Sequence, residues 1–233
     1  MGINEKFLGV GGGTTCICDF PSGAGGIALY QLNTNANDTC GNYNANSETN
    51  ITYSAGKFGN AAQFNGTSSN IEFPAGDFTN TTVSVSAWIY STSNASDQNI
   101  FCNFDYIGGV SRGFIFRKNA GTGSGVLEIQ LYNGAGSYGT TTATVTNNVW
   151  THVVVTIDTT GAKIYIDGGT PFSLTAPNAM AFHTATTRAG IGSYRWVGSS
   201  FQQFFDGGID QVRIYNSVLT SAQVTELYNE TVC

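Results

Sequence analysis

Charged residues are scarce in this chain. Only 10% of its 233 residues are Asp, Glu, Lys or Arg, and 9 basic against 15 acidic side chains give a formal charge of -6, whereas about a quarter of an average soluble domain is charged. An acidic chain with no cluster of Lys and Arg repels phosphate backbones, which argues against nucleic acid as a partner. Gly, Asn, Ser and Thr occupy the positions that Lys and Glu usually take, as is typical of a loop-rich β protein.

Long hydrophobic runs are also absent. No stretch of about 18 uncharged apolar residues occurs, which is the length that a membrane-spanning helix needs. Residues 1–10 have no basic segment followed by an apolar one, so they do not fit a standard secretory signal. We therefore expect no membrane partner.

Cysteine is sparse, and its number is odd. With five cysteines, at least one thiol is free or pairs between chains. Cys102 lies in the apolar run 100–104, which predicts a buried thiol. The remaining cysteines are Cys16, Cys18, Cys40 and Cys233. A disulfide among them depends on the redox compartment, which the sequence does not give.

Short alternating segments dominate the chain from residue 27 onward. Apolar and polar residues alternate at 83–90 and at 127–132, and turn residues at 159–161 join the segments 152–158 and 163–167 into a predicted hairpin. Clusters of Gly, Asn, Ser and Thr separate such segments. This pattern predicts one β-sandwich or barrel, which commonly reaches this length as a single domain.

The two ends of the chain depart from the alternating pattern. Glycine clusters at 11–13 and 25–26 predict an N-terminal arm over residues 1–26, which leads into a domain at residues 27–233. Near the other end, Thr220 and Gln223 fit a helix capping box, and apolar residues follow at helical spacing. We expect one short C-terminal helix.

Five blocks of sequence, in order, resemble laminin-G-like domains of the concanavalin A-like jelly-roll class. They are LYQL with NDTCGN within residues 29–42, GKFGNAAQFNGTSS at 56–69, VSAWI at 85–89, WTHV at 150–153 with IYIDG at 164–168, and FDGGIDQVRIYN at 205–216 with the helix that follows. This resemblance implies an all-β fold: a two-sheet antiparallel jelly-roll sandwich with a short C-terminal helix.

The glycine-rich start and the surface rich in Asn, Thr and Ser resemble the forms of this domain found in tailed-phage virion proteins. That resemblance implies a non-enzymatic protein at the virion surface, as a capsid decoration, fibre or adhesin that attaches to host glycans. Its arm would contact other virion subunits or a second copy of the chain. The alternative is a calcium-dependent, carbohydrate-binding lectin module of an extracellular bacterial protein. A polysaccharide-cleaving enzyme is a third hypothesis.

The acidic residues argue against the enzyme. Hydrolysis of a glycoside needs two carboxylates across a substrate groove, whereas Glu128 stands alone in its predicted strand and Asp105 has no acidic partner nearby in sequence. The resemblance places His152 beside the strand tryptophan, where we expect it to make a structural hydrogen bond. We therefore predict no catalytic residues.

The resemblance also implies a calcium ion, which maps to Asp38, Asn42 and Asp210. Hard oxygen ligands of this kind suit calcium, although Cys40 stands where the family prefers Ser. A different interpretation needs no metal: Asp38 makes an Asx turn and Asp210 caps the entry to the last strand. Both interpretations are open at the level of sequence.

One segment, residues 193–203, combines aromatic rings with polar groups. Rings offer apolar faces to a sugar, and Arg and Gln can bond its hydroxyl groups, so this segment predicts a carbohydrate site. Its residues are Tyr194, Arg195, Trp196, Phe201 and Gln202, which Tyr106, Tyr132 and Tyr138 could join. The same residue types are enriched in subunit interfaces and could instead cover the edge of the sandwich.

Overall fold

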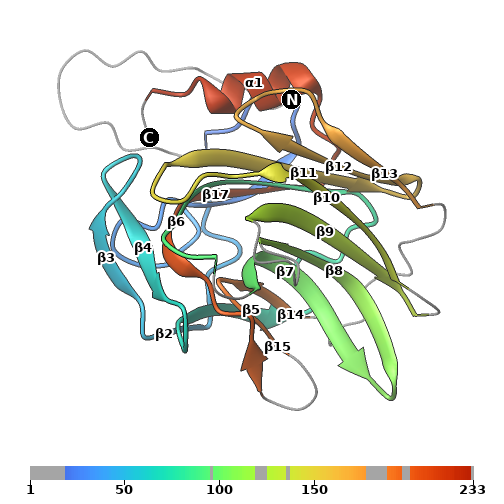
Figure 1. Cartoon of the computed structure of the whole chain (residues 1–233), viewed down its shortest axis with the longest axis horizontal. Helices are drawn as coiled ribbons and strands as arrows, with labels where there is room; N and C mark the ends of the chain where they lie inside the picture. Colours follow the sequence, from blue (N-terminus) through green and yellow to red (C-terminus); the bar gives the residue numbers. More distant parts are fainter. Residues whose placement is uncertain are drawn as a thin grey trace.

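A computed structural model describes residues 19–94, 97–118, 125–134, 137–176, 188–195 and 200–231. Within these residues the chain forms two antiparallel sheets packed face to face, with one short helix near the C-terminal end (Figure 1). The predicted two-sheet sandwich is confirmed. No helix in the described part is long and apolar enough to cross a membrane.

The larger sheet of the described chain has eight strands. In order of hydrogen bonding they are β13 (Phe172–Thr175), β12 (Gly161–Ile166), β11 (Thr151–Asp158), β6 (Val83–Ser91), β17 (Asp206–Tyr215), β4 (Asn60–Asn65) and β3 (Thr52–Ala55), with β1 (Gly26–Tyr30) also paired to β17. The predicted hairpin is confirmed, because β11 pairs with β12 from Val153↔Ile166 to Asp158↔Gly161.

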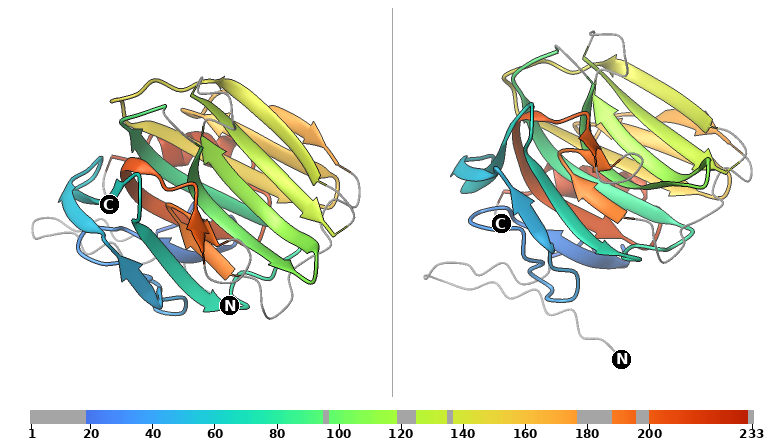
Figure 2. Two further views of the ribbon diagram at one scale, coloured as in Figure 1. Left: turned by 60° about the horizontal axis from the view of Figure 1, so that its bottom comes forward. Right: turned by 90° about the horizontal axis from the view of Figure 1, so that it is seen from below.

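The second sheet has seven strands among the described residues. In order they are β10 (Ser137–Thr144), β9 (Val126–Asn133), β8 (Val110–Lys118), β7 (Gln98–Ile107), β14 (Arg188–Ile191), β5 (Asn70–Ala75) and β2 (Ser47–Thr49). A separate two-stranded hairpin, β15 (Tyr194–Arg195) with β16 (Phe201–Gln202), follows β14. It lies beside β5 and β14, at the bottom of Figure 1 and in front of the sheet in the left view of Figure 2.

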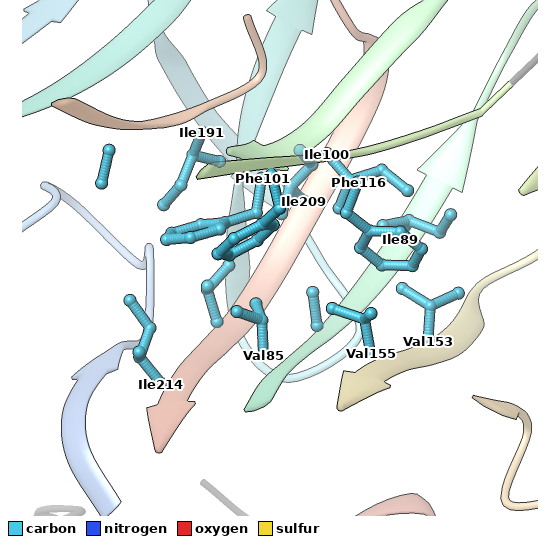
Figure 3. Packing of buried hydrophobic residues seen from close by; sticks show 14 of the residues in the cluster. Val85, Ile89, Ile100, Phe101, Phe116, Val153, Val155, Ile191, Ile209 and Ile214 are labelled. Atoms are coloured by element: carbon cyan, nitrogen blue, oxygen red, sulfur yellow. The ribbon is translucent and has the colours of Figure 1, made fainter. Parts of the chain in front are cut away.

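The core fills the space between the two sheets. Alternate residues of each strand point inward, so Val85 and Ile89 of β6 meet Phe101 of β7 and Phe116 of β8 across this space (Figure 3). All four side chains are at most 1% exposed. Burial of this apolar surface at about 25 cal/mol per Å² is the main stabilising contribution to the fold.

The helix α1 (Ser221–Tyr228) covers the outer face of the eight-stranded sheet. It begins at the predicted capping box, in which the Thr220 side chain accepts from the Gln223 backbone N–H and the Gln223 side chain accepts from the Thr220 backbone N–H. Its apolar residues Val224 and Leu227 pack against the sheet. Phe20, from the predicted arm, joins this second cluster.

The two cysteines of the described residues, Cys40 and Cys102, are in different states. Cys102 is a free, buried thiol in β7, as predicted. Cys40 is disulfide-bonded, and its partner lies outside the described residues.

A buried lysine holds together two loops at one end of the sandwich, the loop after β6 and the loop before β11. Lys118, at the end of β8, is fully buried. Its ammonium donates to Ser91 Oγ at 2.8 Å, to the Ser93 carbonyl at 2.9 Å and to Asn147 Oδ1 at 2.7 Å. Burial lowers the pKa of Lys118 to about 8. These neutral acceptors take the place of water around the charge.

Replacement of Lys118 by Met tests this role. The substitution keeps the apolar stem but leaves several buried acceptors without a donor, so we expect the free energy of unfolding to fall by about 2–4 kcal/mol. Urea or thermal unfolding measures the change. Lys163→Met, at an exposed position of β12, is the matched control and should change stability by less than about 0.5 kcal/mol. Equal effects of the two substitutions would contradict the assigned role.

Candidate functional site

The outer face of the seven-stranded sheet carries the mixture of side chains expected of a binding surface. Because Leu127, Ile129 and Leu131 of β9 point into the core, the residues between them point outward. Four rings and two apolar side chains form a cluster on this face: Cys102, Phe104, Ile115 and Tyr194, with the half-buried Tyr106 and Tyr132 packed against them. We call this surface, with the β15–β16 hairpin lying on it, the outer face.

The β15–β16 hairpin brings together four of the five residues predicted to bind sugar. Tyr194 pairs with Gln202, and Arg195 pairs with Phe201. The ring of Tyr194 packs edge-on against Phe104, with the ring centroids 5.6 Å apart, and its hydroxyl donates to Gln202 Oε1 at 3.3 Å.

Tyr194 is buried, whereas the sequence predicts an exposed ring. It is only 6% exposed, because its ring completes the apolar cluster on the sheet, and it therefore supports the hairpin from below. Gln202 is exposed and Phe201 is half-buried, so both present atoms to solvent. Trp196 lies outside the described residues, as does the side chain of Tyr138.

Arg195 is held in place by a ring and a carboxylate. Its guanidinium carbon lies 5.1 Å from the centroid of Phe201, and Nη2 lies 3.2 Å from Glu72 Oε1 of β5. Arg188, at the start of β14, also approaches Glu72, with Nη1 3.6 Å from Oε1. Two arginines therefore share one carboxylate. The sequence does not predict the pairing of Glu72 with Arg188, because β5 and β14 are more than a hundred residues apart and neither residue belongs to a motif.

A second ion cluster lies on β8 and β9, across the outer face. Arg117 donates from Nε to Glu128 Oε2 at 2.6 Å, from Nη1 to Asp97 Oδ2 at 3.3 Å and from Nη2 to Gln130 Oε1 at 3.3 Å. Its side chain and that of Glu128 are each 14% exposed. Glu128 is thus fixed by a charge-assisted hydrogen bond.

Asp105, the other acid weighed as catalytic, is also in an ion pair. Its Oδ1 lies 3.9 Å from Arg112 Nη1, on the neighbouring strand β8. Asp105 and Glu128 thus belong to separate ion pairs, with Arg112 and Arg117 respectively.

His152 lies on the opposite side of the molecule, beneath α1. Its Nε2 is 2.8 Å from Ser86 Oγ, which confirms the structural hydrogen bond that the sequence analysis predicts. The ring packs between Trp88 and Tyr228, at centroid distances of 5.1 Å and 6.2 Å. Burial, together with the positive charges of Arg213 and Lys57, lowers the pKa of His152 to about 3. The imidazole is therefore neutral at physiological pH.

The turn at residues 38–43 is organised by one carboxylate. Asp38 Oδ1 accepts from the backbone N–H groups of Leu29 and Cys40, each at 2.9 Å, and Oδ2 accepts from those of Asn42 at 3.0 Å and Tyr43 at 3.1 Å. Asp38 is 5% exposed. Four backbone donors account for burial of this charge without a cation.

Asp210 has a different environment. It is fully buried in β17 and accepts from the Phe58 backbone N–H at 2.9 Å, while its Oδ1 has no hydrogen-bond partner among the described residues. Burial raises the pKa of Asp210 to about 7. The described residues contain no cluster of three or more His, Cys, Asp or Glu side chains arranged to hold a metal ion. Calcium binding by Asp38, Asn42 and Asp210 stays a prediction.

The substitution Asp38→Asn separates the two interpretations of the turn. An amide NH₂ in place of one oxygen cannot accept a hydrogen bond, so two of the four backbone N–H groups would face another donor. We therefore expect a loss of about 1–3 kcal/mol in the free energy of unfolding. Thermal unfolding should give the same loss in calcium and in chelator, because the backbone bonds form in both. Asn42→Ala, which removes a side chain that is exposed and makes a 3.4 Å bond to the Cys40 carbonyl, is the control. A loss confined to calcium buffer for both variants would assign the turn to a metal.

Comparisons with known proteins agree with this architecture. A family model described as the concanavalin A-like lectin/glucanases superfamily matches residues 65–225. No curated protein matches the sequence.

Several solved structures share the fold. Domain 4 of AbnA, an extracellular GH43 arabinanase from Geobacillus stearothermophilus solved in complex with arabinotriose, is 25% identical with a TM-score of 0.69, covering 88% of this chain and 98% of that domain. A botulinum neurotoxin serotype D/C binding domain is 14% identical with a TM-score of 0.67, and a Trypanosoma rangeli sialidase is 17% identical with a TM-score of 0.64. Each match covers 88% of this chain, but only 52% of the neurotoxin chain and 32% of the sialidase chain.

Proposed function

Because the chain belongs to the concanavalin A-like lectin/glucanases superfamily, we propose that it is a non-catalytic carbohydrate-binding domain whose binding surface is the outer face. The observation that carries this proposal is the arrangement at the β15–β16 hairpin. There the guanidinium of Arg195 lies over the half-buried ring of Phe201, and the exposed Gln202 follows Phe201 in β16, with its amide oxygen bonded to the Tyr194 hydroxyl.

This arrangement has the chemistry that sugar recognition needs. A ring presents an apolar surface to the C–H groups of a sugar, while amide and guanidinium groups donate to its hydroxyl oxygens. The pairing of Arg195 with Glu72 and its contact with Phe201 restrict the side chain before any ligand arrives. A restricted side chain loses less conformational entropy on binding. The half-buried Tyr106 of β7 and Tyr132 of β9 pack against the same apolar cluster as Tyr194 and extend this surface.

The structural relatives support the same class of ligand. The AbnA domain was solved with an arabino-oligosaccharide and matches this chain along almost its whole length. The other two matches are far less identical, so they support only the fold. Since fold alone does not determine function, the proposal depends on the side chains of the outer face.

A binding role fits the acidic residues better than a catalytic one. Glycoside hydrolysis requires a protonated acid and a second free carboxylate flanking the bond. Glu128 instead forms a charge-assisted pair with Arg117, and Asp105 pairs with Arg112. We therefore propose no catalytic residues.

The setting that we infer is a virion surface, where the domain would attach a particle to host glycans and the N-terminal arm would contact other subunits or a second copy. Its support is the sequence resemblance to tailed-phage proteins. The alternative setting is a calcium-dependent lectin module of an extracellular bacterial protein, and the match to a domain of an extracellular arabinanase favours it. Carbohydrate binding is common to both settings.

Replacement of Phe201 by Ala tests the proposed surface. We expect the wild-type chain to bind at least one class of oligosaccharide on a glycan array, and the variant to bind it about 10-fold more weakly, which corresponds to about 1.4 kcal/mol. Isothermal titration gives the affinities.

Phe172→Ala provides the control, since Phe172 is 36% exposed on the edge strand of the other sheet. It should bind as the wild type does. No binding to any glycan, or equal losses in the two variants, would contradict the proposal.

A further inference from the structure

The outer face has a charge balance unlike that of the rest of the chain. Three of the five arginines, Arg117, Arg188 and Arg195, lie on it in ion pairs with three carboxylates, Glu72, Asp97 and Glu128. These six side chains sum to zero charge, whereas the chain as a whole carries a formal charge of -6. An anionic ligand would meet less repulsion here than on the rest of the surface.

The charges of the outer face form two ion clusters of opposite excess charge. At the end formed by β5, β14 and the hairpin, Arg188 and Arg195 share Glu72, which leaves one positive charge in excess. At the β8–β9 end, Arg117 lies between Asp97 and Glu128, which leaves one negative charge in excess. Asp97 also accepts from Gln203 Nε2 at 3.2 Å, directly after the hairpin, so this carboxylate is bound from both sides.

Solvent at the positive end meets guanidinium groups more than it meets the carboxylate. The side chains of Arg188 and Arg195 are 37% and 27% exposed, whereas Glu72 is 10% exposed. Each guanidinium carries five N–H donors in a planar fork that matches a carboxylate. Donors therefore remain for a ligand after Glu72 is bound.

We propose that the positive end of the outer face binds the carboxylate of an acidic sugar through Arg188 and Arg195, with the sugar ring against Phe201. This inference rests on the proposed function and narrows it to acidic glycans. Glu72 acts as a positioning residue, because its buried carboxylate holds both guanidinium groups on the same side of the hairpin.

Both positively charged residues at the positive end are arginines, and this favours a carboxylate ligand over other anions. The lysines of the described chain lie elsewhere: Lys57 is over the ring of Trp88, Lys118 is buried and Lys163 is exposed on β12. Planar, bidentate recognition of a carboxylate is what arginine provides and lysine does not.

The test is a glycan array that carries oligosaccharides of uronic acids and of sialic acids. The same array carries the carboxyl-reduced derivative of each, together with neutral glycans. We expect the full chain to bind at least one acidic glycan, and carboxyl reduction to weaken that binding at least 10-fold. Arg188→Gln and Arg195→Gln should each weaken binding to the acidic glycan at least 10-fold. Each of the two substitutions should weaken binding to the carboxyl-reduced derivative less than it weakens binding to the acidic glycan.

Lys163→Gln is the matched control, since it removes one positive charge from an exposed position on the other sheet, and it should bind as the wild type does. Thermal unfolding verifies that each variant is folded. Binding that is equal for acidic and carboxyl-reduced glycans, or equal losses in Lys163→Gln and the arginine variants, would overturn this inference and leave the proposed function intact. Failure to bind any glycan on the array would overturn both.

Discussion

The packing of the two sheets against each other is the constraint on which the rest of this structure depends. Val85, Phe101 and Phe116 point into the common core, and a one-residue slip in any strand would turn its apolar side chains outward. The inward set is therefore fixed by burial. Because the side chains of a strand alternate, the outward set is fixed at the same time, including Glu128 and Tyr132 of β9. The outer face takes its geometry from a core that has no binding role.

The two outer faces of the sandwich have different surroundings. That of the eight-stranded sheet lies under α1, and it buries Trp88, His152 and Arg213. Arg213 forms an ion pair with Glu230 at 2.7 Å, beyond the end of the helix. The outer face of the seven-stranded sheet instead carries the short β15–β16 hairpin. This asymmetry assigns a structural role to one set of polar side chains and leaves the other set accessible to a ligand.

Local patterns in the sequence account for much of the fold. Alternation at 83–90, the turn at 159–161 and the capping box at Thr220 depend on neighbouring residues, and each predicts an element that the structure contains. The site was only partly predictable. Aromatic and polar residues close in sequence pointed to the hairpin, but burial of Tyr194 depends on Phe104, ninety residues earlier. The sharing of Glu72 by Arg188 and Arg195 depends on strand pairing that no local pattern records.

We propose that ligands bind to the outer face, at the hairpin. The most direct test is a crystal structure of the chain with the glycan that binds it most tightly. We expect a sugar ring in contact with Phe201 and polar contacts from Arg195 or Gln202. A sugar bound beneath α1, or at the turn around Asp38, with the outer face empty would contradict it.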